Sequence, residues 1–237
     1  MPGTPTYRIF PLGDSAITLD FGNQIDEEIN RKVLALFHLL IKEPLPGTID
    51  VVPAYSSIAI YYDVYQLRKK ADDRRTVFEW MKEQLEKKLR QDPIAEVEDP
   101  SRVITIPVCY AKEFAPDIDR LAKAKQLSVE EVIQIHTSRT YRVYMLGFLP
   151  GFSYMAEVDT RIEMPRREES RQSVEAGSVG IAGKQTGIYP LVSPGGWQII
   201  GRTPVRMFDA NKEEPIYLKA GDRVQFISIS KNEFENY

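Results

Sequence analysis

A polar segment with two prolines near the middle of the chain constrains the fold more than any other feature. Residues 91–101 contain Pro93 and Pro100 among mostly polar side chains, which is typical of an interdomain linker. Helix and strand patterns alternate before this segment, whereas short strand patterns dominate after it. At roughly 150 residues per domain, a chain of 237 residues can hold one large domain or two small ones. We therefore expect an N-terminal domain at residues 1–95 and a C-terminal domain at residues 102–237.

The N-terminal part has the pattern of a small α/β domain. Asp26 can cap a helix whose first turn carries Glu27 and Glu28, because carboxylates interact favourably with the free amides at a helix N-terminus. A second helix is predicted to open at Asp72 and Asp73 and to bury one apolar face. Helices between β segments favour a sheet covered on one face, in a ferredoxin-like arrangement. Four strands are predicted, at residues 7–10, 16–21, 49–52 and 57–62.

The C-terminal part is dominated by short strands between Gly- and Pro-containing turns. Two helices are expected, at residues 117–125 and from Ser128 to about His136, where Ser128 and Glu131 have the spacing of a capping box. Many short strands with few helices indicate a β-barrel or sandwich. The fold class expected for the whole chain is therefore α+β. Strands are predicted at residues 103–108, 140–146, 180–182, 198–201, 205–208, 216–218 and 223–228.

Composition excludes several classes of protein. The 31 basic and 34 acidic residues give a net charge of −3, which argues against a strongly basic nucleic-acid-binding protein. No apolar run approaches the roughly 20 residues of a membrane span, and the N-terminus lacks the pattern of a signal peptide. Cys109 is the only cysteine, so no intramolecular disulfide can form and a cytoplasmic location is expected. No zinc site is predicted from one cysteine and two histidines, whereas a carboxylate-bound Mg²⁺ stays open.

The dipeptide Gly183-Lys184 has part of the pattern of a phosphate-binding loop but lacks its spacing. That motif needs a glycine five residues before Gly183 and a Ser or Thr after the lysine. Ser178 and Gln185 stand at these two positions. We therefore expect no Walker-type nucleotide site in this chain.

Two Pro-Gly dipeptides in the C-terminal part predict tight turns beside aromatic residues. The first lies in Gly147-Phe148-Leu149-Pro150-Gly151-Phe152, and the second in Ser193-Pro194-Gly195-Gly196-Trp197. Glycine tolerates the positive φ that a type II turn requires at this position. Each segment is either a turn between core aromatics or a rigid pocket wall where a ligand meets the backbone. Together, the two turns could rim one cleft.

Two further features have both a structural and a functional interpretation. His136 at a helix C-terminus is suited to proton transfer near neutral pH, and the helix dipole would stabilise its cation. Packing or capping is the structural alternative.

The long irregular segment 159–178 holds Arg161, Arg166, Arg167 and Arg171 among acidic residues. It is either a solvated loop of mixed charge or a lid whose arginines clamp an anion.

Several long motifs follow one another in the C-terminal part. They are His136-Thr137-Ser138, Tyr141-Arg142-Val143-Tyr144, the two Pro-Gly segments, Ala176-Gly177-Ser178-Val179, residues 185–190 and Gly201-Arg202-Thr203-Pro204. In this order they resemble the family of 5-oxoprolinase B subunits, also called allophanate hydrolase subunit 1 or the Kip sensor-kinase inhibitor (KipI) family. The first half of the chain matches more loosely, through Gly13-Asp14-Ser15-Ala16.

The resemblance implies a C-terminal cyclophilin-like β-barrel after the N-terminal α/β domain. It also implies that the chain is one component of a larger enzyme. Similar proteins act with a C subunit, which is like allophanate hydrolase subunit 2, and with a separate A subunit. Together they hydrolyse 5-oxo-L-proline to L-glutamate with ATP, which is expected to come with Mg²⁺ and to be supplied in the complex. Two alternatives come from other branches of the family: an inhibitor that binds a sporulation-type histidine kinase, and a carboxyltransferase component that needs a biotin carrier.

On this resemblance, the candidate site is the cleft between the two Pro-Gly turns. His136 is the candidate for proton transfer. Arg142, Lys184 and Arg202 are candidates for phosphate or carboxylate contacts, Arg142 being counted with the catalytic residues. Oriented hydrogen bonds are expected from Gln185, Tyr189 and Ser193. The walls would be formed by Phe148, Pro150, Gly151, Phe152, Pro194, Gly195, Gly196 and Trp197.

The long arginine segment departs from the family pattern. Ser170-Arg171 stands where a Pro-Arg pair is expected, and Glu175-Ala176-Gly177 where Pro-Ala-Gly is expected. Loss of two prolines is expected to loosen the segment, and Glu175 adds negative charge. Anion binding through this segment is therefore in doubt, but the fold is not.

Overall fold

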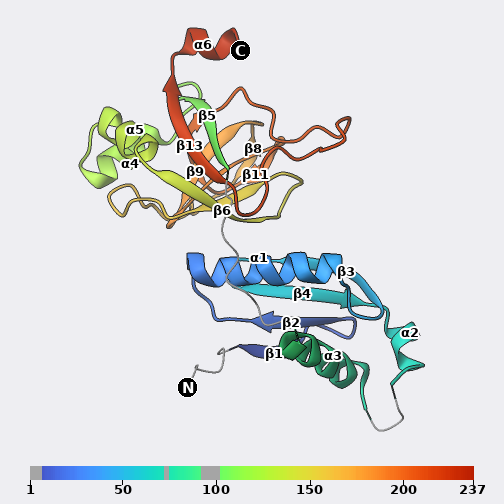
Figure 1. The fold of residues 1–237 in the computed structure, drawn as a ribbon. Coiled ribbons are helices and arrows are strands. Elements are labelled where there is room, and N and C mark those ends of the chain that lie inside the picture. The colour runs from blue at the N-terminus through green and yellow to red at the C-terminus, as the bar shows by residue number, and fades with distance from the viewer. Residues whose placement is uncertain (1–6, 72–74, 92–101) are drawn as a thin grey trace. The chain divides into compact units, whose positions relative to one another are not determined.

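The chain divides into two compact units, Met1–Asp99 and Pro100–Tyr237 (Figure 1). The computed structural model describes residues 7–71, 75–91 and 102–237. The division falls inside the predicted linker at residues 91–101, nearly all of which lies outside the described residues.

A four-stranded antiparallel sheet with strand order β1-β2-β4-β3 is the framework of the first unit. Its strands are β1 (Arg8–Pro11), β2 (Ala16–Asp20), β3 (Thr48–Pro53) and β4 (Ser57–Tyr62), and its helices are α1 (Glu27–Lys42), α2 (Val64–Arg68) and α3 (Val77–Gln91). Apart from the short α2, the run β2-α1-β3-β4-α3 follows the ferredoxin-like order. The remaining strand, β1, precedes this run instead of following it, so the ferredoxin-like assignment stays a prediction.

Local sequence signals explain where the two long helices begin. The Asp26 carboxylate accepts from the Ile29 amide at 2.8 Å, which confirms the predicted cap of α1. The predicted start of the second helix is wrong, because α3 begins at Val77. Thr76 and Glu79 exchange backbone and side-chain hydrogen bonds there, which satisfies the free amides of the first turn. Asp72 and Asp73 lie outside the described residues.

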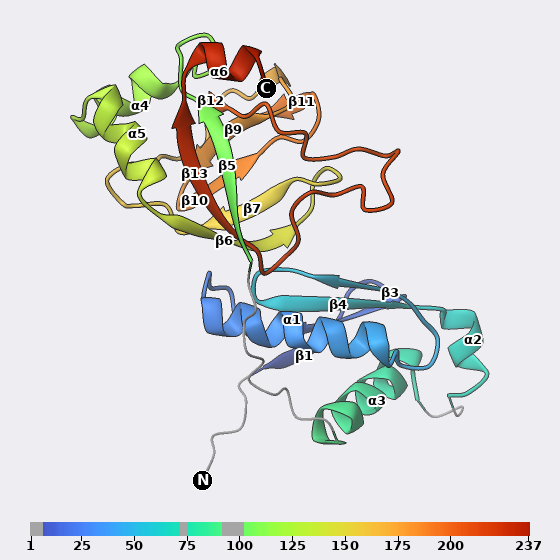
Figure 2. The ribbon, with the colours of Figure 1, turned by 45° about the horizontal axis from the view of Figure 1, so that its top comes forward.

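The helices of the first unit bury apolar side chains against the sheet. Helix α1 lies along β3 and β4, and α3 contacts β2 (Figure 2). The resulting core includes Val33, Leu36 and Leu40 of α1, Ile17 and Leu19 of β2, Ile58 and Ile60 of β4, and Met81 and Leu85 of α3. Burial of this apolar surface is the main contribution to the stability of the unit.

The second unit contains a closed β-barrel with strand order β10-β7-β6-β13-β5-β12-β9, in which β9 pairs with β10. The barrel strands are β5 (Val103–Cys109), β6 (Thr140–Leu146), β7 (Ser153–Ala156), β9 (Ser178–Ala182), β10 (Gln185–Ile188), β12 (Gln198–Arg202) and β13 (Arg223–Ile229). A separate pair is formed by β8 (Arg171–Val174) and β11 (Ser193–Gly195). The predicted barrel is thus confirmed, whereas its cyclophilin-like character stays a prediction.

Short helices accompany the barrel: α4 (Ile118–Lys125), α5 (Val129–Thr137) and α6 (Lys231–Glu235). The capping box predicted for α5 is confirmed, since Ser128 and Glu131 exchange side-chain and backbone bonds. Helix α4 contacts β12, and α5 contacts β13. Within residues 7–71, 75–91 and 102–237, no helix has both the length and the apolarity needed to cross a bilayer.

Two of the predicted strands do not form. Residues 205–208 and 216–218 lie outside the strands and meet only at an isolated bridge between Phe208 and Ile216. Their short apolar runs serve the core instead, because Met207 and Leu218 are buried in the main cluster of the barrel unit. A short apolar run does not by itself distinguish a strand from a buried loop.

Candidate functional site

The structure confirms one predicted turn and corrects the other. Gly151 adopts a φ of +83°, as the second central residue of a type II turn requires. Ser193–Gly195, in contrast, forms strand β11 and pairs with β8. Its proline is tolerated there because the pair is only two strands wide and both strands are therefore edges.

The two Pro-Gly segments nevertheless lie side by side, joined by packed rings. The ring centroid of Phe152 lies 5.3 Å from that of Trp197 and 5.1 Å from that of Tyr189, and both pairs have edge-to-face geometry. Tyr154 completes an aromatic cluster, with its ring 4.8 Å from Phe152 and 5.9 Å from Trp197. Because Phe152, Tyr189 and Trp197 are at least 96% buried, their rings fill the space where a cleft was predicted.

Glycines allow the aromatic cluster to close. A Cβ atom on Gly195 would overlap the Tyr189 hydroxyl, and one on Gly187 would lie 3.1 Å from the Trp197 ring and 3.2 Å from the Phe152 ring. Gly195 therefore belongs to the site for a steric reason and not because it makes a turn.

A charged cluster formed by Asp117, Arg167 and Arg171 adjoins these rings. The Asp117 carboxylate is 2% exposed and accepts from Arg167 at 2.9 Å and from Arg171 at 2.7 Å. Its second oxygen accepts from the Ile199 amide at 2.7 Å. Two guanidinium groups thus share one carboxylate, which leaves an excess of one positive charge.

The charged cluster and the aromatic cluster are continuous. Arg171 pairs in register with Gly195, and the Arg167 amide donates to the Gly196 carbonyl at 2.7 Å. Burial raises the pKa of Tyr189, while nearby Arg166 and Arg171 act in the opposite direction. One guanidinium nitrogen of Arg171, Nη1, is buried and has no hydrogen-bond partner in the described part of the chain. The arrangement therefore places two guanidinium groups beside a packed aromatic cluster.

The arginine segment makes several contacts with the rest of the barrel unit. Arg167 and Arg171 bind Asp117, and Met164 forms a bridge with Gly183. Glu175, where the family pattern has proline, lies 3.8 Å from Arg202. Ion pairs and strand β8 thus hold the segment where the prolines are missing, and the expected loosening stays a prediction.

His136 does not have the surroundings of a proton-transfer group. It is fully buried, its ring stacks on Phe226 at 4.7 Å, and burial lowers its pKa from 6.5 to about 3. Nδ1 lies 2.8 Å from the Tyr110 hydroxyl and Nε2 lies 3.1 Å from Thr186 Oγ1. Burial outweighs the helix dipole, so the predicted cation is wrong and the structural interpretation is supported.

The bonds around His136 also define its tautomer. Thr186 donates its single hydroxyl proton to the Gly180 carbonyl at 3.0 Å, so Oγ1 can only accept from the histidine. The neutral imidazole is therefore protonated on Nε2 and accepts from Tyr110 at Nδ1. This neutral ring links α5 to Tyr110, which directly follows β5, and to Thr186 in β10.

The remaining predicted site residues lie on several strands and loops of the second unit. Lys184 lies 3.9 Å from Glu157, and Arg202 donates to the Ala176 carbonyl at 2.8 Å. Arg142 is buried in β6 and Gln185 opens β10, and both lie in register with Ala156 of β7, which stands between them. Phe148 and Pro150 are exposed, and the Ser193 hydroxyl donates to the Pro194 carbonyl at 3.2 Å. Of the proposed phosphate contacts, Lys184 and Arg202 thus have different partners, and Arg142 lies in the same row of the barrel as Gln185.

Asp117 is the residue that sequence reasoning missed. Its position before an apolar pattern predicts a helix start, and α4 does begin at the next residue. Its side chain makes no capping bond and turns to the arginines instead. A group of arginines indicates that an acidic partner is needed nearby in the fold. Here that partner, Asp117, lies 50 residues before Arg167 in the chain, so the sequence alone did not identify it.

Comparisons with known proteins agree with this architecture. The family described as "Carboxyltransferase domain, subdomain C and D" matches residues 7–218. The 5-oxoprolinase B subunit of Bacillus subtilis (strain 168) is 45% identical, over 99% of this chain and 98% of that protein. The same protein of Escherichia coli O157:H7 is 34% identical, over 93% of this chain and 95% of its own length. The crystal structure of TTHA0988 superposes with a TM-score of 0.77 at 38% identity, covering 91% of this chain and 40% of that chain.

The fold and these matches define a carboxyltransferase-domain protein of the subdomain C and D type. The chain belongs to the family of 5-oxoprolinase B subunits, as its sequence motifs predicted.

Proposed function

We propose that this chain is the B subunit of an ATP-dependent 5-oxoprolinase, which acts with the A and C subunits to convert 5-oxo-L-proline to L-glutamate. The observation that carries the proposal is the 45% identity to a protein of that name over nearly the full length of both chains.

Within this function, the charged cluster of Asp117, Arg167 and Arg171 binds the carboxylate of the substrate. The substrate is a five-membered lactam that carries a carboxylate. The side chain of Arg171 is 24% exposed, and a guanidinium binds a carboxylate through paired hydrogen bonds. Asp117 acts as a positioning residue, because its carboxylate holds both guanidinium groups. Half-buried Tyr154 and exposed Phe148, at the edge of the aromatic cluster, would supply an apolar surface for the ring.

ATP and Mg²⁺ are assigned to the complex and not to this chain. Lys184 and Arg202 already engage Glu157, Glu175 and the Ala176 carbonyl, and Arg142 is buried. His136 is enclosed and neutral, so no proton transfer is assigned to it. ATP supplies activation of the poorly electrophilic lactam carbonyl, and this chain contributes binding and orientation.

The test is coexpression of the chain with the A and C subunits, followed by measurement of glutamate formation from 5-oxo-L-proline and ATP. We expect the assembled complex to be active. Arg171→Lys should raise KM for 5-oxo-L-proline roughly tenfold with little change in kcat, because lysine loses the paired donors.

Arg161→Lys is the matched control, since Arg161 lies in the same segment but pairs with Asp159 at 3.0 Å. An assembled complex without activity would contradict the proposed function. An active complex whose KM is the same in both variants would contradict only the assigned anion contact.

A carboxyltransferase component is the second candidate, and the family description favours it. This candidate requires a biotin-carrying partner. An assembled complex that transfers a carboxyl group from carboxybiotin and forms no glutamate would favour it over the 5-oxoprolinase. The kinase-inhibitor alternative predicts inhibition of autophosphorylation by the isolated chain. His136→Ala does not separate these candidates, because the residue is part of the core.

A further inference from the structure

Two neighbouring loops of the second unit, residues 147–151 and 190–192, expose apolar side chains. Phe148 is 63% exposed, Val192 59% and Leu191 36%. The loops adjoin one another, because a Cβ atom on Gly151 would lie 3.5 Å from the Cβ atom of Pro190. Exposed apolar side chains that gather in this way mark interaction sites. The two loops together are called the apolar surface below.

The chain around both loops carries no charge. Residues 143–156 and 185–201 contain no Asp, Glu, Lys, Arg or His, although 27% of the whole chain is charged. A third segment beside Gly151 does hold charges, but its Arg206 and Asp209 pair with one another at 3.2 Å. Depletion of charged residues is typical of the centre of a protein–protein interface, so a protein partner fits this surface better than a small charged ligand.

Phe148 is held in a strained backbone conformation. Among the residues that the structure describes, only Phe148 and Gln126 combine a side chain with a positive φ, at +69° and +56°, and Gln126 ends helix α4. The Leu149 amide donates to the Gly147 carbonyl at 2.8 Å, so Phe148 is the central residue of a γ-turn of the rare, strained kind. Strain of this sort persists mainly at functional sites, and here it keeps a large ring exposed.

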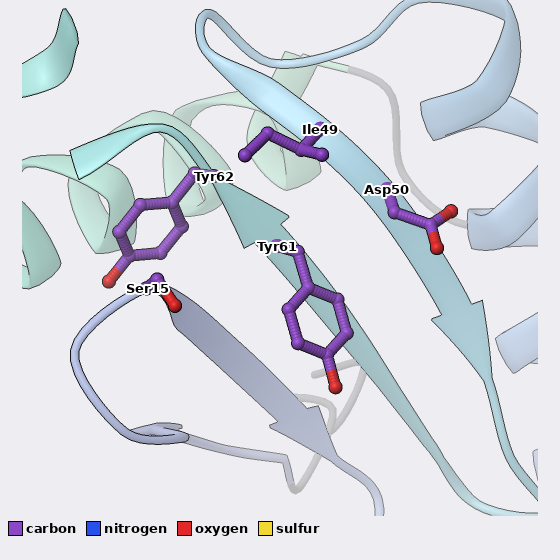
Figure 3. A pocket seen from close by; sticks show the side chains of 5 residues that line it. All are labelled: Ser15, Ile49, Asp50, Tyr61 and Tyr62. Atoms are coloured by element: carbon purple, nitrogen blue, oxygen red, sulfur yellow. The ribbon is translucent and has the colours of Figure 1, made fainter. Parts of the chain in front are cut away.

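A hollow in the first unit is the alternative interaction site. Exposed Ile49 and Tyr61 stand beside the Asp50 carboxylate there (Figure 3). That hollow therefore includes a charge, and the positive φ angles among the described residues of the first unit all belong to glycines. The apolar surface of the second unit is thus the better-supported docking site.

The comparisons indicate what covers the apolar surface. This chain covers 40% of TTHA0988, so more than half of that chain lies outside the shared fold. The B subunit of Bacillus subtilis, in contrast, is matched over 98% of its length. The part that is joined to the fold in one relative is thus absent from the other chain, for which a separate protein would supply it. The family description names only two subdomains, C and D, of a carboxyltransferase domain, which agrees with such a division.

We propose that the apolar surface binds the C subunit of the complex. This inference rests on the proposed function, which supplies that subunit, and it adds where the subunit docks. Phe148 and Val192 would insert into an apolar surface of the C subunit. The docked subunit would also cover the surface assigned above to the substrate ring, at Tyr154 and Phe148, and would exclude water from it.

The test measures binding of the purified C subunit to the full chain by titration calorimetry. Val192→Glu should raise the dissociation constant at least about tenfold, because docking would bury a carboxylate. Phe148→Asn should raise it by a similar factor although it relieves strain, since asparagine tolerates a positive φ. The stability of Phe148→Asn to urea should therefore equal or exceed that of the parent chain, a result that a purely structural role for Phe148 would not give.

Ile49→Glu is the matched control, because Ile49 is 69% exposed but lies in the first unit; it should bind like the parent chain. Failure of the C subunit to bind, equal weakening by Ile49→Glu, or unchanged binding in both loop variants would overturn the proposal. Self-association of the isolated chain that Val192→Glu abolishes would also overturn it, since a second copy would then occupy the surface. Glutamate formation is not part of this readout, so a bound but inactive complex would contradict only the proposed function.

Discussion

At the scale of single residues, protonation of His136 would place a cation in an enclosed site bounded by hydroxyl groups and rings. Its pKa is about 3 in the folded protein and 6.5 when unperturbed. Between these values the unfolded chain binds more protons, so the free energy of unfolding falls as the pH is lowered, by up to about 1.4 kcal/mol per pH unit. We expect this loss between pH 6.5 and 5, measured by urea titration of Trp197 fluorescence in a Trp80→Phe background.

The chain offers a matched control for this prediction, because its second histidine, His38, is exposed. His38→Gln should keep the pH dependence of stability, whereas His136→Gln should remove most of it even though it lowers stability overall. A His136→Gln chain with the parent's pH dependence would assign the acid sensitivity to other groups.

His136 also shows why sequence reasoning reaches some residue roles and not others. Its place at a helix end is local information, and it was predicted correctly. Its partners Tyr110 and Thr186 lie 26 and 50 positions away. The helix dipole alone predicts a cation, whereas the enclosure that makes the ring neutral depends on strands that only the fold brings together.

At the scale of elements, Asp117 connects three parts of the second unit: the start of α4, strand β12 through Ile199, and the arginine segment. Asp117→Asn would leave two guanidinium groups without their shared counter-charge. Removing one partner of a buried ion pair is strongly destabilising, so we expect the free energy of unfolding to fall by about 3 kcal/mol in a urea titration.

Asp119→Asn provides the comparison, since this aspartate of α4 has an exposed side chain 3.9 Å from Lys112. Exposed pairs of this kind contribute about 0–1 kcal/mol, so stability should change little. Equal destabilisation by the two substitutions would mean that Asp117 acts only through its place at the helix start.

Strand β11 carries a second prediction at this scale. In Gly195→Ala the new methyl group would meet the Tyr189 hydroxyl, and overpacking of this kind costs about 1–3 kcal/mol. We expect lower stability and altered Trp197 fluorescence, because Tyr189 and Trp197 belong to one aromatic cluster. Pro194→Ala, at an exposed position of the same strand, should leave both properties nearly unchanged.

Elements whose signals are local were predicted well. The capping box of α5 and the cap of α1 each depend on residues within a few positions of one another. Strand β11 was missed because Pro194-Gly195 favours a turn by composition, and only pairing with β8, about 20 residues earlier, makes it a strand. The unusual Pro-Gly motifs made it possible to predict that the two segments lie together. The sequence did not show that buried rings fill the space between them.

At the scale of the whole molecule, the barrel closes entirely within residues 103–229. Its first strand β5 pairs in parallel with its last strand β13, and β9 pairs with β10. Every strand of the ring therefore finds its partners without the first unit. The main apolar cluster of this unit, from Ile106 to Phe226, likewise draws all of its members from residues after 102.

This closure predicts that residues 102–237 fold when expressed alone. We expect a cooperative thermal transition, a far-UV circular dichroism spectrum dominated by β-structure, and the same loss of stability on Asp117→Asn as in the full chain, because all partners of Asp117 lie in this unit. A piece that unfolds without cooperativity would show that the barrel needs the first unit. A folded piece insensitive to Asp117→Asn would instead show that the charged cluster forms only in the full chain.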